Sequence, residues 1–402
     1  MSDPLTTVAP DEDVRGRHFD KLSVSRFLSA ASLRESTLLG IVALIWVFFY
    51  ISTDGVFLTP RNLVLLALQT SIVSLAAISA VMLIVSRNFD LSVGSAVAFV
   101  GVVVALLAGK YDFSPAVAVP VAIVVGLLMG AWQGFWVTRV GVSSFIVTLA
   151  GMLYFRGFSM IATNGATIAS LPRPLTRFAT GFLPPGPSFL IVLGLFGSYA
   201  VFRVLELRRA HNLAVIRNFE GAVFKALVPA AIAAAIALLI ASWQGIPYLV
   251  LLVAICALAA EIVMRRTRFG THLYAIGGNP EAARLAGINI KKVVFWNFVI
   301  AGLAYGITGV ALTARVGGAV AGSAGLFLEL DAIAAAIIGG TALSGGRGRV
   351  VGALVGALLM GSLNNGMSLM NVPPFYQDTA RGIVLLLAVA LDHLSRRRSR
   401  GE

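Results

Sequence analysis

The stretch RRTRFGTHLYAIGGNPEAARLAGINIKK, Arg265–Lys292, is an island of charge and glycine in a chain that is otherwise almost wholly apolar. Apolar segments long enough to cross a membrane precede and follow it, so it must lie in water at one membrane face. Within it, Asn279 is a favourable N-cap, Pro280 suits the first helical position and Glu281 suits the positive end of the helix dipole. Gly287 is a natural stop. The stretch therefore predicts a short capped helix just outside the bilayer.

This predicted helix presents small apolar side chains over two turns, a length of about 10 Å. A surface of that kind, carried on a basic loop, suits a groove on a soluble partner. The alternative is a loop helix that rests on its own protein. The residues that we assign to the partner surface are Asn279, Pro280, Glu281, Ala282, Ala283, Arg284, Leu285 and Gly287.

The composition sets the fold class. The chain has 402 residues, of which 58% are hydrophobic and 12% are charged, whereas a soluble domain carries about 25% charged residues. Long apolar runs rather than short alternating strands predict an all-α polytopic membrane protein with about twelve transmembrane helices. The expected spans are 33–52, 62–85, 91–109, 115–137, 143–163, 188–206, 226–243, 247–264, 292–314, 326–345, 350–370 and 375–394.

Basic residues predict the orientation of these spans. With the N-terminus in the cytoplasm, 24 of the 31 lysines and arginines fall on the cytoplasmic side, as the positive-inside rule requires. We therefore expect a cytoplasmic tail at 1–32, a transmembrane domain at 33–394, a cytoplasmic loop at 265–292 and a basic cytoplasmic tail at 395–402. The net charge of +13 follows this topology, so nucleic-acid binding is not expected.

A similarity between two segments of the sequence predicts how the spans are organised. VGLLMGAWQG (Val125–Gly134) resembles VGALLMGSLNNG (Val355–Gly366), although glycine-rich apolar segments can also be alike by chance. As an internal repeat, this similarity pairs the first five spans, 33–163, with the last five, 247–394. Because five is odd, the halves must have opposite orientation, as in many transporters. The remaining spans, 188–243, are then a two-helix insertion.

The longest predicted external loop is Asn164–Pro187, which contains five prolines. Because proline fixes φ, we expect this loop to be stiff rather than flexible. It is either a docking ledge for an external partner or a plain connector.

Polar groups inside spans are costly in lipid and so mark a possible pathway. Most of them here are amides and hydroxyls with aromatic rings nearby, a lining that suits a neutral, hydroxyl-rich solute. The alternative is hydrogen bonding between helices. The candidate pathway residues are Gln69, Asn88, Asp90, Ser92, Trp132, Gln133, Phe145, Asn297, Asn364 and Asn365.

The acidic residues near span starts are Asp90, Glu329 and Asp331. A carboxylate there favours the helix dipole and can cap free N–H groups, although a proton relay is the alternative. Asp378 and Arg381 lie three residues apart, so we expect them to neutralise each other.

Catalytic and metal-binding patterns are not apparent. The four histidines have no metal-ligand spacing, and GGTALSGGRG (Gly339–Gly348) lacks the Lys-Ser/Thr of a phosphate loop. We expect this glycine-rich segment to serve close helix packing. The chain is therefore expected to be neither an enzyme nor an ATP-binding protein, and to hold no metal.

Four motifs in order resemble those of ABC sugar-importer permeases of the ribose/xylose class. They are NFDLSVGS (Asn88–Ser95), GGNPEAARLAGI (Gly277–Ile288), LELDAIAAAIIGGTALSGGRG (Leu328–Gly348) and GSLNNG (Gly361–Gly366). The likeness runs from about Leu38 to Asp392. Ribose-type members resemble the chain without residues 188–243, and the longer middle resembles the xylose-type permeases.

The resemblance implies a bacterial inner-membrane protein with both termini in the cytoplasm, working as two permease copies among membrane lipid. A cytoplasmic ATPase with two nucleotide-binding modules, which binds the ATP and Mg, would drive it, and a periplasmic sugar-binding protein would deliver cargo. By this match Glu281, Ala282, Arg284 and Gly287 fall on the ATPase-coupling helix. The expected cargo is a pentose, D-xylose.

A function from another class stays open at this point. An inverted repeat also fits a stand-alone ion-coupled secondary transporter or a channel for a small polar solute. Against that alternative stand the lack of a mid-membrane charged pair and the presence of a helix shaped for a partner.

Overall fold

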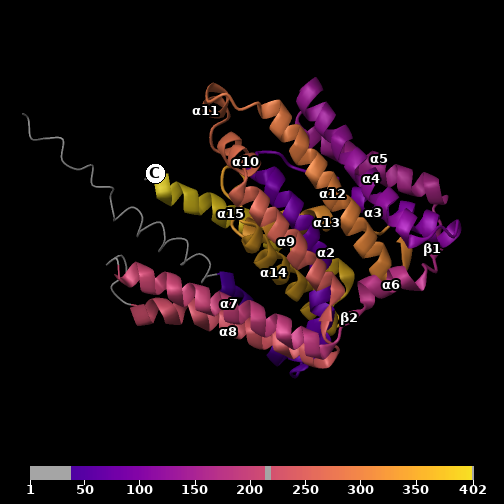
Figure 1. Cartoon of the computed structure of the whole chain (residues 1–402). Coiled ribbons are helices and arrows are strands. Elements are labelled where there is room, and N and C mark those ends of the chain that lie inside the picture. The colour runs from indigo at the N-terminus through magenta and orange to yellow at the C-terminus, as the bar shows by residue number, and fades with distance from the viewer. Residues whose placement is uncertain (1–37, 213–218, 401–402) are drawn as a thin grey trace, which may run out of the picture.

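A computed structural model describes residues 38–212 and 219–400 of the chain, and these residues form a bundle of helices with four very short strands (Figure 1). The long helices are Leu38–Ser52, α2 (Pro60–Val85), α3 (Val93–Val104), α4 (Pro115–Phe135), α5 (Ser144–Thr163), α7 (Pro185–Asn212), α8 (Phe219–Trp243), α9 (Tyr248–Arg266), α12 (Ile290–Val316), α14 (Val350–Leu369) and α15 (Pro374–Arg400). The short helices are η1 (Val56–Leu58), α6 (Arg173–Thr180), α10 (Arg268–Gly278), α11 (Pro280–Leu285) and α13 (Leu328–Ile338). Two helices run on as π-helical turns, α3 through Ala105–Lys110 and α4 through Trp136–Val140.

Over the part of the chain that it describes, the structure supports nine of the twelve expected spans as membrane-spanning helices. Within the described residues, nine helices are long and apolar enough to cross a membrane. The helix Leu38–Ser52, α13 and α15 occupy the other three expected spans. The chain is thus an all-α polytopic protein.

One expected span is wrong in length. Instead of 326–345, helix α13 covers only Leu328–Ile338, about 16 Å at the usual rise per residue, against a hydrocarbon core of about 30 Å. The helix begins after Phe327, whose positive φ of 61° breaks the helical path, and ends at Gly339. The rest of the expected span is the loop before α14.

The helices of the two halves pack on each other in matched pairs. Helix α4 packs on α12 and α14 packs on α2, while α3 packs on α12 and α13 packs on α2. In the proposed repeat α4 corresponds to α14, α2 to α12 and α3 to α13. Each of these four contacts therefore has its counterpart, which is the pattern that an internal repeat of the two halves predicts.

Glycines bring the α4 and α12 backbones into direct contact. A Cβ on Gly130 would lie 2.2 Å from the carbonyl oxygen of Phe298, and one on Gly302 would lie 2.4 Å from that of Gly126. No side chain fits at either position, so glycine is what lets the two helix backbones approach this closely. In the second half, a Cβ on Gly356 would meet the Ala335 carbonyl oxygen at 2.1 Å, which places α14 equally close to α13.

The proline-rich loop Asn164–Pro187 is held at both ends by short strands. In it, β1 (Thr167–Ala169) pairs antiparallel with β4 (Gly318–Val320), and β2 (Phe182–Leu183) pairs antiparallel with β3 (Ile246–Pro247). Helix α6 lies between β1 and β2 and buries Leu175 and Ala179. The loop is therefore an ordered ledge that joins the first half to the second.

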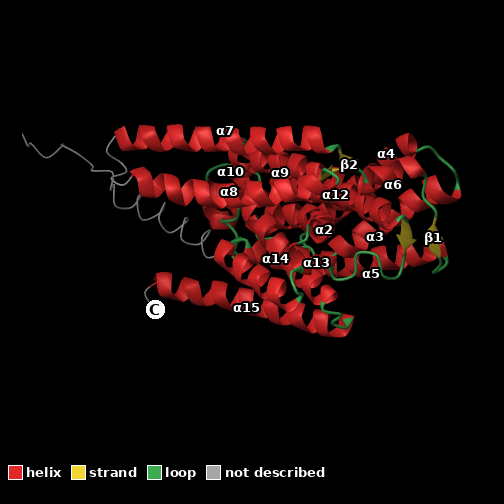
Figure 2. Ribbon diagram, turned by 90° about the horizontal axis from the view of Figure 1, so that it is seen from below, coloured by secondary structure: helices red, strands yellow, loops and turns green. Residues whose placement is uncertain are grey.

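The shorter elements lie at the two ends of the bundle, and α7, α8 and α15 lie on its sides. Helices α10 and α11 and the end of α15 lie at one end, with β1, β2 and α6 at the other (Figures 1 and 2). The basic loop at 265–292 thus lies away from the proline-rich ledge, in agreement with the charge distribution. Helices α7 and α8 pack together along the side opposite α15 (Figure 2), as a two-helix insertion can.

The glycine contact makes a stability prediction. Gly130→Ala should lower the midpoint of thermal unfolding of the detergent-purified protein by several degrees, because overpacking costs about 1–3 kcal/mol. Tryptophan fluorescence during heating measures this midpoint. The matched control is Gly194→Ala on α7, where a Cβ meets nothing within 4 Å. Equal midpoints for the two variants would contradict the proposed role of the α4–α12 contact.

Candidate functional site

Helix α11 forms with the caps that its sequence predicts. The Asn279 side-chain oxygen accepts the backbone N–H groups of Glu281 and Ala282, each at 3.1 Å, and Pro280 takes the first helical position. Gly287 adopts a φ of 80° after the last turn. These local bonds allow a helix of six residues to persist without a long apolar face.

The exposed surface of α11 is smaller than expected. Glu281 and Arg284 form an ion pair of 3.0 Å with side chains that are 75% and 68% exposed, and Leu285 is 82% exposed. Ala283 is instead buried, at 4% exposure. It packs the helix onto its own protein and is not available to a partner, whereas the other three side chains are.

Arg87 ties the base of α11 to the first half of the chain. It lies in the loop between α2 and α3 with a φ of 63°. Its Nε donates to the carbonyl oxygen of Gly277 at 2.8 Å and its Nη2 to that of Gly278 at 2.9 Å. These are the residues directly before the Asn279 cap, so the two bonds join the base of α11 to the α2–α3 loop.

A third segment completes this junction. The Gly346 N–H donates to the Val85 carbonyl oxygen at 2.9 Å, and Tyr274 Oη donates to the Gly348 carbonyl oxygen at 2.8 Å. A Cβ on Gly277 would lie 1.8 Å from the Val85 oxygen. The glycine-rich segment Gly339–Gly348 thus serves packing, as expected. We call the meeting point of Val85–Arg87, Tyr274–Gly278 and Gly345–Gly348 the three-loop junction.

Three of the candidate pathway residues, Asp90, Ser92 and Gln133, lie close together with Tyr305 between α3, α4 and α12. Asp90 accepts the Ser92 N–H at 2.8 Å and the Ser92 hydroxyl at 2.7 Å, and it also accepts the hydroxyl of Tyr305. Gln133 donates to Ser92 Oγ at 2.5 Å. All four side chains are at most 4% exposed. This set, the Asp90 cluster, is a closed network in which the polar groups bond each other rather than face a cavity.

The other amides bond across helices in the same way. Asn62 donates to Asn365 at 2.8 Å, and Asn365 lies 3.4 Å from Gln69. Asn297 donates to the Met82 carbonyl oxygen at 2.9 Å and to Ser86 Oγ at 3.0 Å, and Asn88 also donates to Ser86 Oγ. The interhelical alternative therefore describes the contacts of Gln69, Asn297 and Asn365, whereas Asn88 bonds within its own loop.

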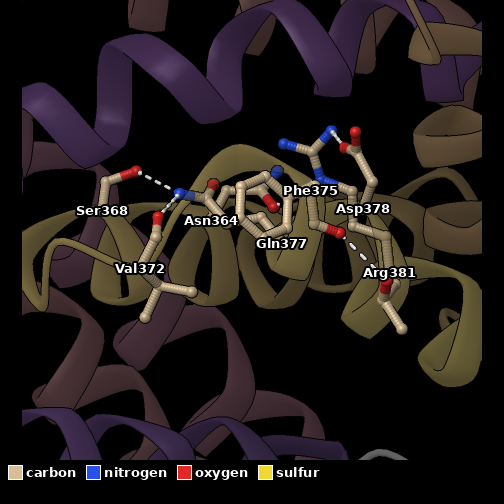
Figure 3. Close-up of polar contacts among 8 residues, drawn as sticks. Asn364, Ser368, Val372, Phe375, Gln377, Asp378 and Arg381 are labelled. Carbon is tan, nitrogen blue, oxygen red and sulfur yellow. Dashed lines mark hydrogen bonds and ion pairs between the residues drawn. The ribbon is translucent and has the colours of Figure 1, made fainter.

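The remaining three candidates take no part in the hydrogen bonds of the Asp90 cluster. Trp132 and Phe145 are each 50% exposed. Asn364 accepts Arg381 Nε at 2.7 Å, and Arg381 also pairs with Asp378 at 3.2 Å, as expected for that pair (Figure 3). The structure thus divides the candidates among separate places rather than along one path.

A second arginine joins the halves at the opposite end. Arg156 of α5 donates to the carbonyl oxygens of Ala321 at 3.2 Å and Ala324 at 2.7 Å, in the loop before α13. Glu329, in the first turn of α13, lies close enough to attract it. Sequence reasoning missed Arg87, Arg156 and Tyr305, because each acts through partners that are more than 150 residues away.

The carboxylates near helix starts occupy different positions from one another. Glu329 and Asp331 lie in the first turn of α13, where the dipole favours them. Asp90 lies before the α3 N-cap, Ser92, and bonds that residue rather than the first helical turn.

The three-loop junction makes a prediction about local dynamics. Arg87→Ala removes both bonds to the α10–α11 link, so amide hydrogen exchange across residues 277–287 should rise by about tenfold, the equivalent of about 1.4 kcal/mol. Exchange measured by mass spectrometry on the detergent-purified protein tests this. Arg139→Ala, at an exposed arginine expected on the same face, is the control and should leave that exchange unchanged. Unchanged exchange in both variants would contradict the junction.

Comparison with known proteins adds an independent line of information. Residues 62–389 match the family model described as branched-chain amino acid transport system / permease component. The chain is 41% identical to the xylose transport system permease protein of Escherichia coli (strain K12), over 92% of the chain and 95% of that protein. It is 40% identical to the corresponding protein of Haemophilus influenzae, over 91% of the chain and 97% of that protein.

A ribose import permease protein of Escherichia coli (strain K12) is also similar, with 33% identity over 91% of the chain and 96% of that protein. No solved structure matches the chain. The family match covers the bundle from α2 to α15 and includes α11 and the three-loop junction. The chain therefore belongs to the family of branched-chain amino acid transport system / permease component proteins.

Proposed function

We propose that the chain is the membrane-spanning permease subunit of an ATP-binding-cassette importer that carries D-xylose into the cytoplasm. The observation that carries this proposal is the similarity to xylose permeases over nearly the whole of both chains. Identity to the ribose permease is lower, 33% against 41%, which supports xylose over ribose as the cargo.

The contacts of α11 support coupling to a separate ATPase. The exposed Glu281, Arg284 and Leu285 offer a charged pair beside an apolar tip, which suits a groove on a soluble protein. A movement of α11 caused by the ATPase would be transmitted to Gly277 and Gly278 and, through the bonds of Arg87, to the α2–α3 loop. ATP and Mg would bind the ATPase, with its two nucleotide-binding modules, and not this chain.

The same proposal includes the other partners and the location. A periplasmic sugar-binding protein would dock at the end of the bundle where β1–β4 and α6 form an ordered ledge. Two copies of the chain would form the pathway in the bacterial inner membrane, with both termini and α11 in the cytoplasm. The insertion α7–α8 lies opposite α15 (Figure 2) and would leave the α5–α15 side open for the second copy.

The coupling surface predicts a loss of transport without a loss of folding. Arg284→Ala and Leu285→Asp should each lower ATP-dependent xylose uptake at least about tenfold, the equivalent of about 1.4 kcal/mol of lost interaction, because both side chains are exposed and available to the ATPase. Uptake of labelled xylose, normalised to the amount of permease in the membrane, measures this. Lys291→Ala, an exposed change outside α11, is the control. Normal uptake in both test variants would refute coupling through α11.

Two measurements distinguish the proposed function from its alternatives: the energy source that drives uptake and the sugar that is carried. In cells without other xylose uptake, the chain with its ATPase and binding protein should import labelled xylose, with ribose a poor competitor. Inactivating the phosphate-loop lysine of the ATPase should abolish uptake. Gradient-driven uptake by proteoliposomes that contain this chain alone would instead favour an ion-coupled transporter or a channel. Preferential import of ribose would refute xylose while leaving the importer class intact.

A further inference from the structure

An open groove lies on the surface of the bundle between α6 and the first two turns of α9. Its volume is about 450 Å³, which is space for about fifteen water molecules at ~30 Å³ each. A groove of this size is large enough for a ligand. Its walls are formed by Pro174, Arg177, Phe178, Tyr248, Leu251, Leu252 and Ile255.

The sequence of α6 gives this short helix two different faces. Leu175 and Ala179 lie four residues apart, are buried and hold the helix on the bundle. Pro174, Arg177 and Phe178 follow the i, i+3, i+4 spacing of a second face, which forms one wall of the groove. Phe178 is 43% exposed there, so this face of α6 is left uncovered by the described chain.

The start of α9 fixes the other wall. The Tyr248 N–H donates to the carbonyl oxygen of Gly181, the residue that follows α6, at 3.1 Å. The Tyr248 ring packs on the same glycine, since a Cβ on Gly181 would lie 3.0 Å from a ring carbon. Ile255, two turns further along α9, is 66% exposed. The groove is therefore built into the contact between α6 and α9.

The groove reaches from the membrane surface into the hydrocarbon region. Helix α9 has 19 residues, about 28 Å at the usual rise, against a hydrocarbon core of about 30 Å. Its first residue, Tyr248, therefore lies at the membrane boundary, a position that tyrosine favours. Leu251 and Ile255 lie about 5 and 10 Å further along the axis, whereas α6 lies at the ledge end (Figure 1). An occupant must be polar at one end and apolar at the other.

Two arginines supply charge at the polar end. Arg173 and Arg177 lie four residues apart on α6 and are both exposed. No side-chain hydrogen bond or ion pair joins either guanidinium to another described residue, and α6 contains no acidic residue. The positive-inside rule leaves few basic residues at this end of the bundle. A guanidinium binds a phosphate group through two parallel hydrogen bonds, so this pair is complementary to a phosphate.

We propose that the groove is a binding site for a membrane phospholipid with a net negative charge. Its phosphate binds Arg177, with Arg173 beside it, and an acyl chain packs along the apolar wall of α9. A zwitterionic lipid fits less well, because the two arginines would repel its cationic group. A soluble partner could contact the arginines but could not fill the part of the groove that lies beside lipid tails.

The inference goes beyond the proposed function, because it assigns a lipid ligand to the chain and requires no transport. A lipid in the groove would contact α6 and α9 together. It would thereby fasten the proline-rich ledge, which contains α6, to the second half of the bundle. Lipid binding and transport can be measured separately, so either idea can fail without the other.

The charge of the groove is tested with two lipids. The detergent-purified chain is titrated with phosphatidylglycerol or phosphatidylcholine, and retained lipid is counted by native mass spectrometry. Arg177→Gln should weaken retention of phosphatidylglycerol about tenfold, because a hydrogen bond between charged groups is lost, and should bring the two lipids close to equality. The control is Arg61→Gln, an exposed arginine at the start of α2 that does not line the groove. It should retain phosphatidylglycerol as wild type does.

The apolar part of the groove is tested by filling it. Ile255→Trp places bulk on an exposed position of the wall, so it should weaken retention of both lipids without unfolding the protein. Leu190→Trp on α7 is the matched control, because Leu190 is 73% exposed and lies outside the groove. Since a ligand of the folded state raises its stability, phosphatidylglycerol should also raise the midpoint of thermal unfolding in wild type and much less in Arg177→Gln.

Three results would overturn the proposal. Equal retention of the two lipids by wild type, unaffected by Arg177→Gln, would mean that only unspecific surrounding lipid is bound. An equal loss in Arg177→Gln and Arg61→Gln would mean that overall charge, rather than the groove, attracts the lipid. Unchanged lipid retention in Arg177→Gln together with weaker binding of the sugar-binding protein would assign Arg177 to protein docking. Failure of xylose uptake would refute the proposed function and leave the lipid measurements as they are.

Discussion

The close approach of α4 and α12 is the constraint on which the rest of the bundle depends. Gly126, Gly130 and Gly302 bring backbone atoms of the two helices to distances at which no side chain fits. In lipid there is little hydrophobic force between helices, so close van der Waals packing supplies much of the attraction. Because α4 belongs to the first half and α12 to the second, this contact also fixes how the two halves sit on each other.

The Asp90 cluster follows from that approach. Gln133 of α4 and Tyr305 of α12 reach Asp90 and Ser92 only because the two helix backbones are so close. Buried polar groups without partners would be costly here, whereas a network in which all of them are bonded specifies one arrangement of the helices. Glycines and polar residues at this contact therefore act together: the former permit the approach, and the latter select its register.

The sequence predicts most of the fold because the strongest signals in it are local. Apolar length locates the helices, and Asn279, Pro280 and Gly287 mark the bounds of α11 within its own few residues. The length of α13 could not be predicted, because apolar residues continue beyond Ile338 and the helix stops where Gly339 packs against Gly352. The burial of Ala283 depends likewise on what lies beneath α11.

The partners of the arginines were beyond sequence reasoning for the same reason. Charge patterning places Arg87 in a cytoplasmic loop and cannot show that carbonyl oxygens 190 residues away receive its bonds. The same holds for the candidate pathway residues. Composition identifies amides inside spans, but whether an amide faces a helix or a solute depends on tertiary contacts, and Asn365 and Asn297 both face helices.

Arg87 and Arg156 offer a way for one movement of α11 to affect both ends of the bundle. Arg87 binds carbonyl oxygens of the second half at the α11 end, and Arg156 does so at the opposite end. A hydrogen bond from a charged group is worth about 1.5–3 kcal/mol, the same scale as the few kcal/mol that separate two conformations of one protein. Under the proposed function, breaking either set of bonds would therefore shift the balance between conformations. Under the proposed function, the rigid α4–α12 contact would act as the pivot, because opening one end about it requires the other end to stay bound.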